Sequence, residues 1–196
     1  MNHYYTDNSD LDSDRKEFTY YFDNEVFRFT TDIGVFSKNS VDYGSYILIR
    51  SIVHRDLGTS FLDLGCGYGP IGIIIKRFHP ETDVELVDVN SRAVELSKLN
   101  GVSNKTDIKV HKCEDITLLD HKFDTIALNP PIRAGKAVIY DLYAKSKEML
   151  GEGGHLYVVI RKDQGAKSSQ KELETRFASV ERIERDGGYF VYDCFN

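Results

Sequence analysis

The residues best suited to chemistry fall in two short motifs, the glycine-rich run Asp63-Leu-Gly65-Cys-Gly67-Tyr-Gly69-Pro-Ile-Gly72 and the later tripeptide Asn129-Pro130-Pro131. Glycines permit a tight turn and let a ligand approach the backbone closely, so the first run predicts a cofactor loop. Its spacing Gly67-x-Gly69-x-x-Gly72 matches the dinucleotide fingerprint, and Asp88 follows at about the distance expected of a ribose-binding acid. The pattern indicates a nucleotide-like cofactor.

An acidic residue at the start of the glycine run narrows the choice of ligand. Asp63 directly precedes the glycines, where a carboxylate favours a positive charge such as an ammonium or sulfonium group over a pyrophosphate. The 196 residues also leave no room for a second full domain that would present a hydride acceptor. An NAD(P)-binding oxidoreductase is therefore the weaker alternative, and a purely local role of Asp63 in capping the turn is another.

An alternation of strands and helices must position these motifs. Apolar runs predict strands at 60–64, 83–88, 107–111, 123–128 and 155–160, with helices at 70–78, 91–100, 137–150 and 168–177. Such alternation is typical of the α/β class, with a mainly parallel sheet covered by helices on both faces. Ligands of these folds bind at the carboxyl ends of the strands, where both motifs are expected to lie.

Segments outside this alternation add antiparallel structure. Aromatic and β-branched residues at 17–22 and 25–31 surround Asp23-Asn24 and predict an N-terminal β-hairpin, and 180–192 predicts a C-terminal antiparallel hairpin. Ser40 is expected to cap a helix that reaches His54. Glycines are expected to end two helices, Gly101 that of 91–100 and the run from Gly151 that of 137–150.

The run from Asp63 to Gly69, with Asp88 ending the second strand, resembles the class I S-adenosylmethionine-dependent methyltransferases. The resemblance implies a Rossmann-like fold with a seven-stranded sheet, and S-adenosylmethionine as cofactor. It places Gly65 and Gly67 along the methionine part, Asp63 near the amino end, and Asp88 on the ribose hydroxyls. The full expected cofactor set is Asp63, Gly65, Gly67, Asp88, Asn90, Asp115 (on the adenine amine) and Asn129.

Asn129-Pro130-Pro131 supplies the expected catalytic residues. The prolines fix φ and hold the preceding residue extended, which preorganises the Asn129 side chain and nearby carbonyl oxygens as acceptors. Two fixed acceptors can aim the lone pair of an exocyclic amine at a methyl group, and no strong base is needed before attack. Catalysis would then consist of positioning plus the leaving-group chemistry of the cofactor. Together the two motifs resemble the amino-group methyltransferases that act on nucleic-acid bases or on glutamine.

The longer string from Asn129 to Lys136 resembles the ribosomal RNA small-subunit methyltransferases, whose typical targets are guanine exocyclic amines. Segments 29–37, 42–45 and 161–166 carry the same resemblance, whereas members with two tandem copies of the fold differ from this single-copy chain. The chain has Ile132 where many such enzymes place an aromatic residue that stacks on the target. Phe36 is a candidate replacement, with core packing as the alternative. The expected substrate contacts are Phe36, Ile132, Arg133 and Lys136.

The favoured hypothesis is methyl transfer to a guanine exocyclic amine of small-subunit rRNA, on free RNA or on the subunit itself. A base that is buried in a helix must be flipped out before such chemistry. Alternatives are a methyltransferase for protein glutamine or another small amine, the NAD(P)-dependent oxidoreductase, and a non-catalytic RNA-binding assembly factor. The intact Asp63, Asp88 and Asn129 set argues against the last.

The net charge of −6 hides an uneven distribution. Residues 1–25 hold seven acids and two bases, whereas residues 131–176 hold nine bases and six acids, which suits a local basic rim for phosphates. We expect an acidic flexible arm at 1–16 and one domain at 17–196, with its hairpin at 17–31 and its Rossmann-like core at 60–196. Without a CxxC or HExxH pattern, a signal sequence or a long apolar run, we expect no metal, no membrane contact and a cytoplasmic location.

Overall fold

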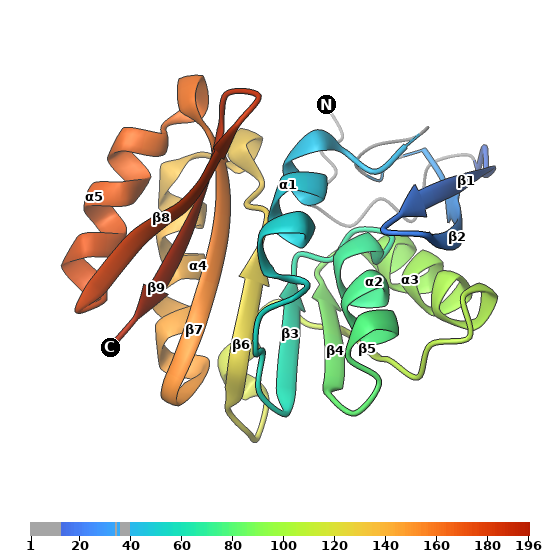
Figure 1. Ribbon diagram of the computed structural model, residues 1–196, viewed down its shortest axis with the longest axis horizontal. Helices are drawn as coiled ribbons and strands as arrows, with labels where there is room; N and C mark the ends of the chain where they lie inside the picture. Colours follow the sequence, from blue (N-terminus) through green and yellow to red (C-terminus); the bar gives the residue numbers. More distant parts are fainter. Residues whose placement is uncertain (1–12, 34, 36–39) are drawn as a thin grey trace.

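A seven-stranded sheet forms the centre of the computed structural model, which describes residues 13–33, 35 and 40–196 (Figure 1). Its strand order is β5-β4-β3-β6-β7-β9-β8; the first five strands of this order are parallel, and β9 and β8 are antiparallel to their neighbours. The strands are β3 (Ser60–Leu64), β4 (Asp83–Asp88), β5 (Lys109–Lys112), β6 (Phe123–Leu128), β7 (Leu150–Arg161), β8 (Ser179–Asp186) and β9 (Tyr189–Phe195). The predicted fold class is confirmed.

Helices cover both faces of this sheet. Alternation along β3 sends Phe61 into one hydrophobic cluster, shared with α1, α2 and α3, and Leu62 into another, shared with α4 and α5. The helices are α1 (Tyr43–Ile52), α2 (Pro70–Phe78), α3 (Ser91–Ser103), α4 (Lys136–Met149) and α5 (Ala166–Arg176), with short 3-10 turns η1 (Ile116–Leu118), η2 (Ile132–Ala134) and η3 (Lys162–Gln164).

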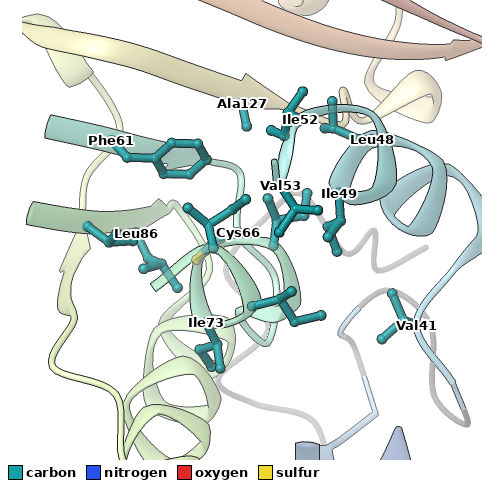
Figure 2. Packing of buried hydrophobic residues seen from close by; sticks show 14 of the residues in the cluster. Val41, Leu48, Ile49, Ile52, Val53, Phe61, Cys66, Ile73, Leu86 and Ala127 are labelled. Atoms are coloured by element: carbon teal, nitrogen blue, oxygen red, sulfur yellow. The ribbon is translucent and has the colours of Figure 1, made fainter. Parts of the chain in front are cut away.

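Side chains distant in the sequence meet in the first cluster. Figure 2 shows Leu48 and Ile52 of α1 near Ala127 of β6, and Cys66 of the glycine loop near Leu86 of β4. These apolar groups are all buried, so the loop that follows β3 is seated directly on the core. The site therefore stands on a close-packed base.

An N-terminal hairpin lies beside α3, outside the main sheet (Figure 1). Its strands β1 (Lys16–Phe22) and β2 (Glu25–Thr31) are joined by Asp23 and Asn24, both at positive φ as the hairpin prediction requires. Asn100 of α3 and Asn104, which caps the C-terminus of this helix, bond the backbone of β2 as a neighbouring strand would. Asn100 exchanges hydrogen bonds of 2.7 and 2.9 Å with the Thr30 backbone, and Asn104 bonds Arg28 in the same way. Asn100 also donates to the carbonyl oxygen of Tyr68 at 2.8 Å, which ties the hairpin to the glycine loop.

Several predicted helix ends were wrong, for identifiable physical reasons. Asp42, not Ser40, caps α1, because its carboxylate accepts from the Ser45 amide at 3.2 Å. Gly101 does not end α3. The helix continues through it to Ser103, and Ile108 packs so closely that a Cβ at position 101 would lie 2.8 Å from that side chain.

The glycines after α4 were also misassigned. β7 begins at Leu150, so Gly151, Gly153 and Gly154 lie inside this strand, where its pairing with β6 changes register. The predicted acidic arm at 1–16 lies mostly outside the described residues. Of its described part, Ser13 and Asp14 bond the carboxylate of Asp32, and Lys16 begins β1.

Candidate active site

A cavity of about 560 Å³ lies along the edge where the parallel strands end. Residues at or just beyond the end of each parallel strand reach it, in the spatial order Ile116 (β5), Asp88 (β4), Gly65 (β3), Asn129 (β6) and Arg161 (β7). β9 runs in the opposite direction, so its first residue reaches the same edge. A cavity of this size, lined from both sides of the point where the strand order reverses, can hold a nucleotide-sized ligand and a second group.

The glycine loop forms one wall of this cavity. Gly65 and Gly67 have φ of 73° and 59°, a region that favours glycine, and a Cβ on Gly65 would meet nothing within 4 Å because it would point into open space. The Gly65 and Cys66 amides donate to the Val87 carbonyl at 2.8 and 3.0 Å. These bonds fix the loop to the end of β4 and leave its open side for a ligand.

Asp88 stands at the junction of that loop and β4. One carboxylate oxygen accepts from the Gly67 amide and the other from the Asn90 amide, each at 2.9 Å. Each oxygen keeps a lone pair for a further donor, as a pair of ribose hydroxyls would require. Burial raises the pKa of Asp88 to about 6, so the carboxylate is charged at neutral pH.

Asp63 lies beneath the loop and is only 1% exposed. One of its oxygens accepts from the Gly72 amide at 2.9 Å, whereas the other is buried without a hydrogen-bond partner in the described residues. Burial raises the pKa of Asp63 to about 7, and the nearby Asp88 charge adds to the effect. Asp63 itself does not line the cavity, so it acts on a ligand through its charge beneath the loop and not by contact. A negative charge there favours a cationic ligand, so the site fits S-adenosylmethionine, which carries an ammonium and a sulfonium.

The raised pKa of Asp63 predicts a pH-dependent stability difference for Asp63→Asn without cofactor. The folded wild type takes up a proton near pH 7 and the unfolded chain near pH 4, so wild-type stability falls as pH rises through that window. Asparagine has no such titration. The free energy of unfolding of the variant, relative to wild type, should rise by about 1–2 kcal/mol from pH 5.5 to pH 8. Urea unfolding at both pH values measures this, and an unchanged difference contradicts the assigned burial cost.

Asn129 directly follows β6 and lies beside the first turn of α1. Its Nδ2 lies 3.3 Å from Asp42 Oδ1 and 3.1 Å from Ser45 Oγ. Because a carboxylate only accepts, this contact determines the orientation of the amide. In the described residues Asn129 Oδ1 makes no hydrogen bond, so this oxygen is available to accept one from a ligand. Pro130, Pro131, Ile132 and Arg133 continue along the cavity wall.

Three expected site residues have other positions, and a fourth lies outside the described residues. Asn90 is fully buried, and its side-chain oxygen caps α3 by accepting from the Arg92 amide at 2.9 Å. Asp115 caps η1, where hydrogen bonds from Thr117 lower the pKa of the Asp115 carboxyl, and Glu114 beside it lines the cavity instead. Lys136 is exposed and does not line the cavity, and Phe36 lies outside the described residues. The ligand contacts expected of these four residues stay predictions.

Sequence reasoning assigned no role to Asp42, Ser45 or Tyr189, all of which line the cavity. The first two belong to the segment 42–45 that carried the family resemblance. The sequence therefore marked this segment but did not indicate what its side chains do. Tyr189 had no signal beyond its place after the turn at Gly187 and Gly188. Its proximity to the site depends on the antiparallel direction of β9.

Comparison with known proteins identifies the family. The family model named "Methyltransferase small domain" matches residues 26–193, which is most of the chain and includes both motifs. The chain belongs to the methyltransferase small domain family. The predicted class, a methyltransferase that depends on S-adenosylmethionine, is confirmed.

Two relatives show how this small-domain methyltransferase compares in length. It is 39% identical over 192 residues to "Uncharacterized protein YbxB" of Bacillus subtilis, an alignment that covers 96% of each chain. It is 32% identical over 163 residues to "Ribosomal RNA small subunit methyltransferase C" of Aeromonas hydrophila, which covers 81% of this chain and 46% of that protein. The chain thus spans about half the length of the methyltransferase C relatives.

A solved structure has the same fold. The 16S rRNA N2 G1207 methyltransferase of T. thermophilus, described in complex with AdoMet and guanosine, superposes with a TM-score of 0.83. Its sequence identity is 23%, and the match covers 93% of this chain and 50% of that one. In the described part of the small-domain methyltransferase, no helix is long and apolar enough to cross a membrane and no three metal-binding side chains cluster.

Proposed function

We propose that this chain transfers a methyl group from S-adenosylmethionine to an exocyclic amine of guanine in small-subunit ribosomal RNA, in the cytoplasm. The observation that carries the proposal is the Asn129 amide, held by Asp42 and Ser45 so that Oδ1 is left as an acceptor in the cavity. The relatives at 32% identity bear the name of an rRNA methyltransferase, which supports this class of substrate.

In this proposal the residues on the two sides of Asn129 have different tasks. Asp88 accepts hydrogen bonds from the ribose hydroxyls, and the glycine loop borders the methionine part. The charge of Asp63, beneath the loop, stabilises the positive charge of the cofactor. When bound, S-adenosylmethionine would supply an electrophilic methyl group on its sulfonium, and S-adenosylhomocysteine would be the leaving group. Asn129 Oδ1 accepts one N–H of the guanine amine and orients its lone pair towards the methyl group. Pro130 and Pro131 restrict the backbone that carries this acceptor.

Basic side chains at the mouth of the cavity would contact the RNA backbone. Arg133 and Arg161 are both exposed and both line the cavity, and Lys162 follows on the same edge. Arg161 is partly neutralised by Asp163, at 3.1 Å from its Nε. Such side chains position phosphates without reading the sequence, so the recognition of one nucleotide must come from inside the cavity.

Asp42→Ser tests the orientation of the Asn129 amide. Serine caps a helix about as well as aspartate, so α1 should keep its start, but its side chain is too short to accept from Asn129 Nδ2. The amide can then rotate, and kcat should fall about tenfold while the Kd for S-adenosylhomocysteine stays within twofold. Asp42→Asn is the matched control, since its Oδ1 can still accept, and it should keep most of the activity. Equal rates for Asp42→Ser and wild type would remove the positioning role.

The proposal as a whole is tested by binding and by transfer. Calorimetry with S-adenosylhomocysteine and with NAD should show tight binding of the first only. Radiolabelled transfer from S-adenosylmethionine should then be measured with total RNA, small ribosomal subunits and protein extract as acceptors. Label in RNA supports the proposal. Label confined to glutamine of a protein would establish the amine alternative, and binding without transfer to any acceptor would favour the non-catalytic assembly factor.

A further inference from the structure

We propose that Tyr189 is the aromatic platform on which the target purine base stacks, in place of an aromatic residue after Pro131. This inference rests on the proposed function, because it names the base-recognition residue of the same cavity. It adds a residue that neither the motifs nor the family resemblance indicated.

The strand order divides the cavity into two halves with Asn129 between them. Asp88 and Gly65, after β4 and β3, lie on one side, which is the half that the cofactor requires. Arg161 of β7 and Tyr189 of β9 lie on the other side, paired with each other across the two strands. Tyr189 therefore borders the half of the cavity left for the methyl acceptor.

The Tyr189 ring is held close to the catalytic amide. An ideal Cβ built on Gly44 would lie 3.0 Å from Tyr189 Cε1 and 3.1 Å from Asp42 Oδ1, so the ring and this carboxylate flank the same point of α1. Asp42 Oδ1 in turn accepts from Asn129. The ring of Tyr43 packs edge-on against Tyr189, with centroids 5.8 Å apart and planes at 63°. A Cβ at position 44 would be tight against both groups, so the glycine lets the ring pack closely on α1 at one side of the cavity.

Other cavity side chains are less suited to stacking. Ile132 has no π-face, and Tyr68 is only 2% exposed, with the rings of Phe18 and Phe29 against it. Tyr189 is partly exposed, and in the described residues its hydroxyl has no hydrogen-bond partner. Among the described cavity residues it is thus the aromatic side chain that a base can reach. An unpaired base gains most from such a surface when it is a large purine.

Kinetics of four variants test the proposal. Tyr189→Leu keeps an apolar side chain against α1 but cannot stack, so the KM for RNA should rise about tenfold while kcat and the Kd for S-adenosylhomocysteine stay within twofold. Tyr189→Phe and Tyr189→Trp keep a π-face and should retain the wild-type KM within threefold. Tyr21→Leu, a tyrosine 74% exposed on the N-terminal hairpin, is the matched surface control and should change nothing. A wild-type KM in Tyr189→Leu would overturn the proposal.

A direct readout uses the absence of tryptophan from the chain. Tyr189→Trp introduces a single indole, whose emission should be quenched saturably by guanosine in the presence of S-adenosylhomocysteine, whereas Tyr21→Trp should show no such quenching. Absence of quenching in Tyr189→Trp, with guanine methylation by the wild type intact, would refute the stacking role alone. If the wild type labels no RNA at all, the proposed function fails first, so the two failures are distinguishable.

Discussion

Asn129→Ala should lose methyl transfer and keep the cofactor. Asn129 lies between the two halves of the cavity, and in the proposed mechanism its Oδ1 is the acceptor that orients the amine. Without it the amine can still enter but is no longer aimed, so kcat should fall about a hundredfold or more. The Kd for S-adenosylhomocysteine should stay within about threefold, because in the proposed mechanism the main cofactor contacts are Asp88 and the glycine loop, at the ends of β4 and β3. Single-turnover transfer and calorimetry on the same preparation measure both quantities.

Asn129→Asp is the control that shows whether a hydrogen-bond acceptor at this position is sufficient, or whether its orientation also matters. The carboxylate can still accept, but it would face the carboxylate of Asp42, which now accepts from the Asn129 amide at 3.3 Å. The like charges should turn the side chain away, and the variant should be nearly as slow as Asn129→Ala. Undiminished turnover in Asn129→Ala would contradict the mechanism.

Asp88→Ala should have the largest effect on cofactor binding. Two ribose hydroxyls lose a charged acceptor, and the Gly67 amide loses the carboxylate that holds the glycine loop. Hydrogen bonds to charged groups contribute about 1.5–3 kcal/mol each, so the loss of two should raise the Kd for S-adenosylhomocysteine about a hundredfold or more. Calorimetry at pH 8, where Asp88 is charged, measures the change.

Asp88→Asn is the companion variant and should bind with intermediate affinity, since it keeps one side-chain acceptor. The same contact predicts that wild-type affinity weakens as pH falls through about 6, where the carboxylate of the free protein takes up a proton. Wild-type affinity in Asp88→Ala would mean that the ribose is held elsewhere in the cavity.

Local patterns were sufficient to predict the central strands. The segments 60–64, 83–88 and 123–128 and the helix 70–78 have the predicted bounds, because each apolar run is short and is enclosed by turn-forming or polar residues. Glycines misled where packing decided the outcome. Gly101 looks like a helix end, yet the helix passes through it, and the glycine is where Ile108 packs against the helix.

The main parts of the site were predictable, whereas their support was not. The glycine loop and Asn129 were predicted to belong to the site because each lies in a short motif of contiguous residues. The hydrogen bond from Asn129 to Asp42 joins residues 87 positions apart, and Tyr189 reaches the cavity only because β9 is antiparallel to β7. Such contacts follow from tertiary packing, which no local pattern in a single sequence encodes.

Mass spectrometry of nucleosides tests the central claim most directly. Small ribosomal subunits and free small-subunit rRNA would be incubated with the protein and S-adenosylmethionine that carries a deuterated methyl group. The RNA would then be digested, and the labelled site would be mapped by oligonucleotide fragmentation. We predict label on the exocyclic amine of one guanosine with the wild type, and none with Asn129→Ala. Label on a ring nitrogen, a ribose or a protein side chain, or no labelled nucleoside in either substrate, would contradict the proposed guanine-amine activity.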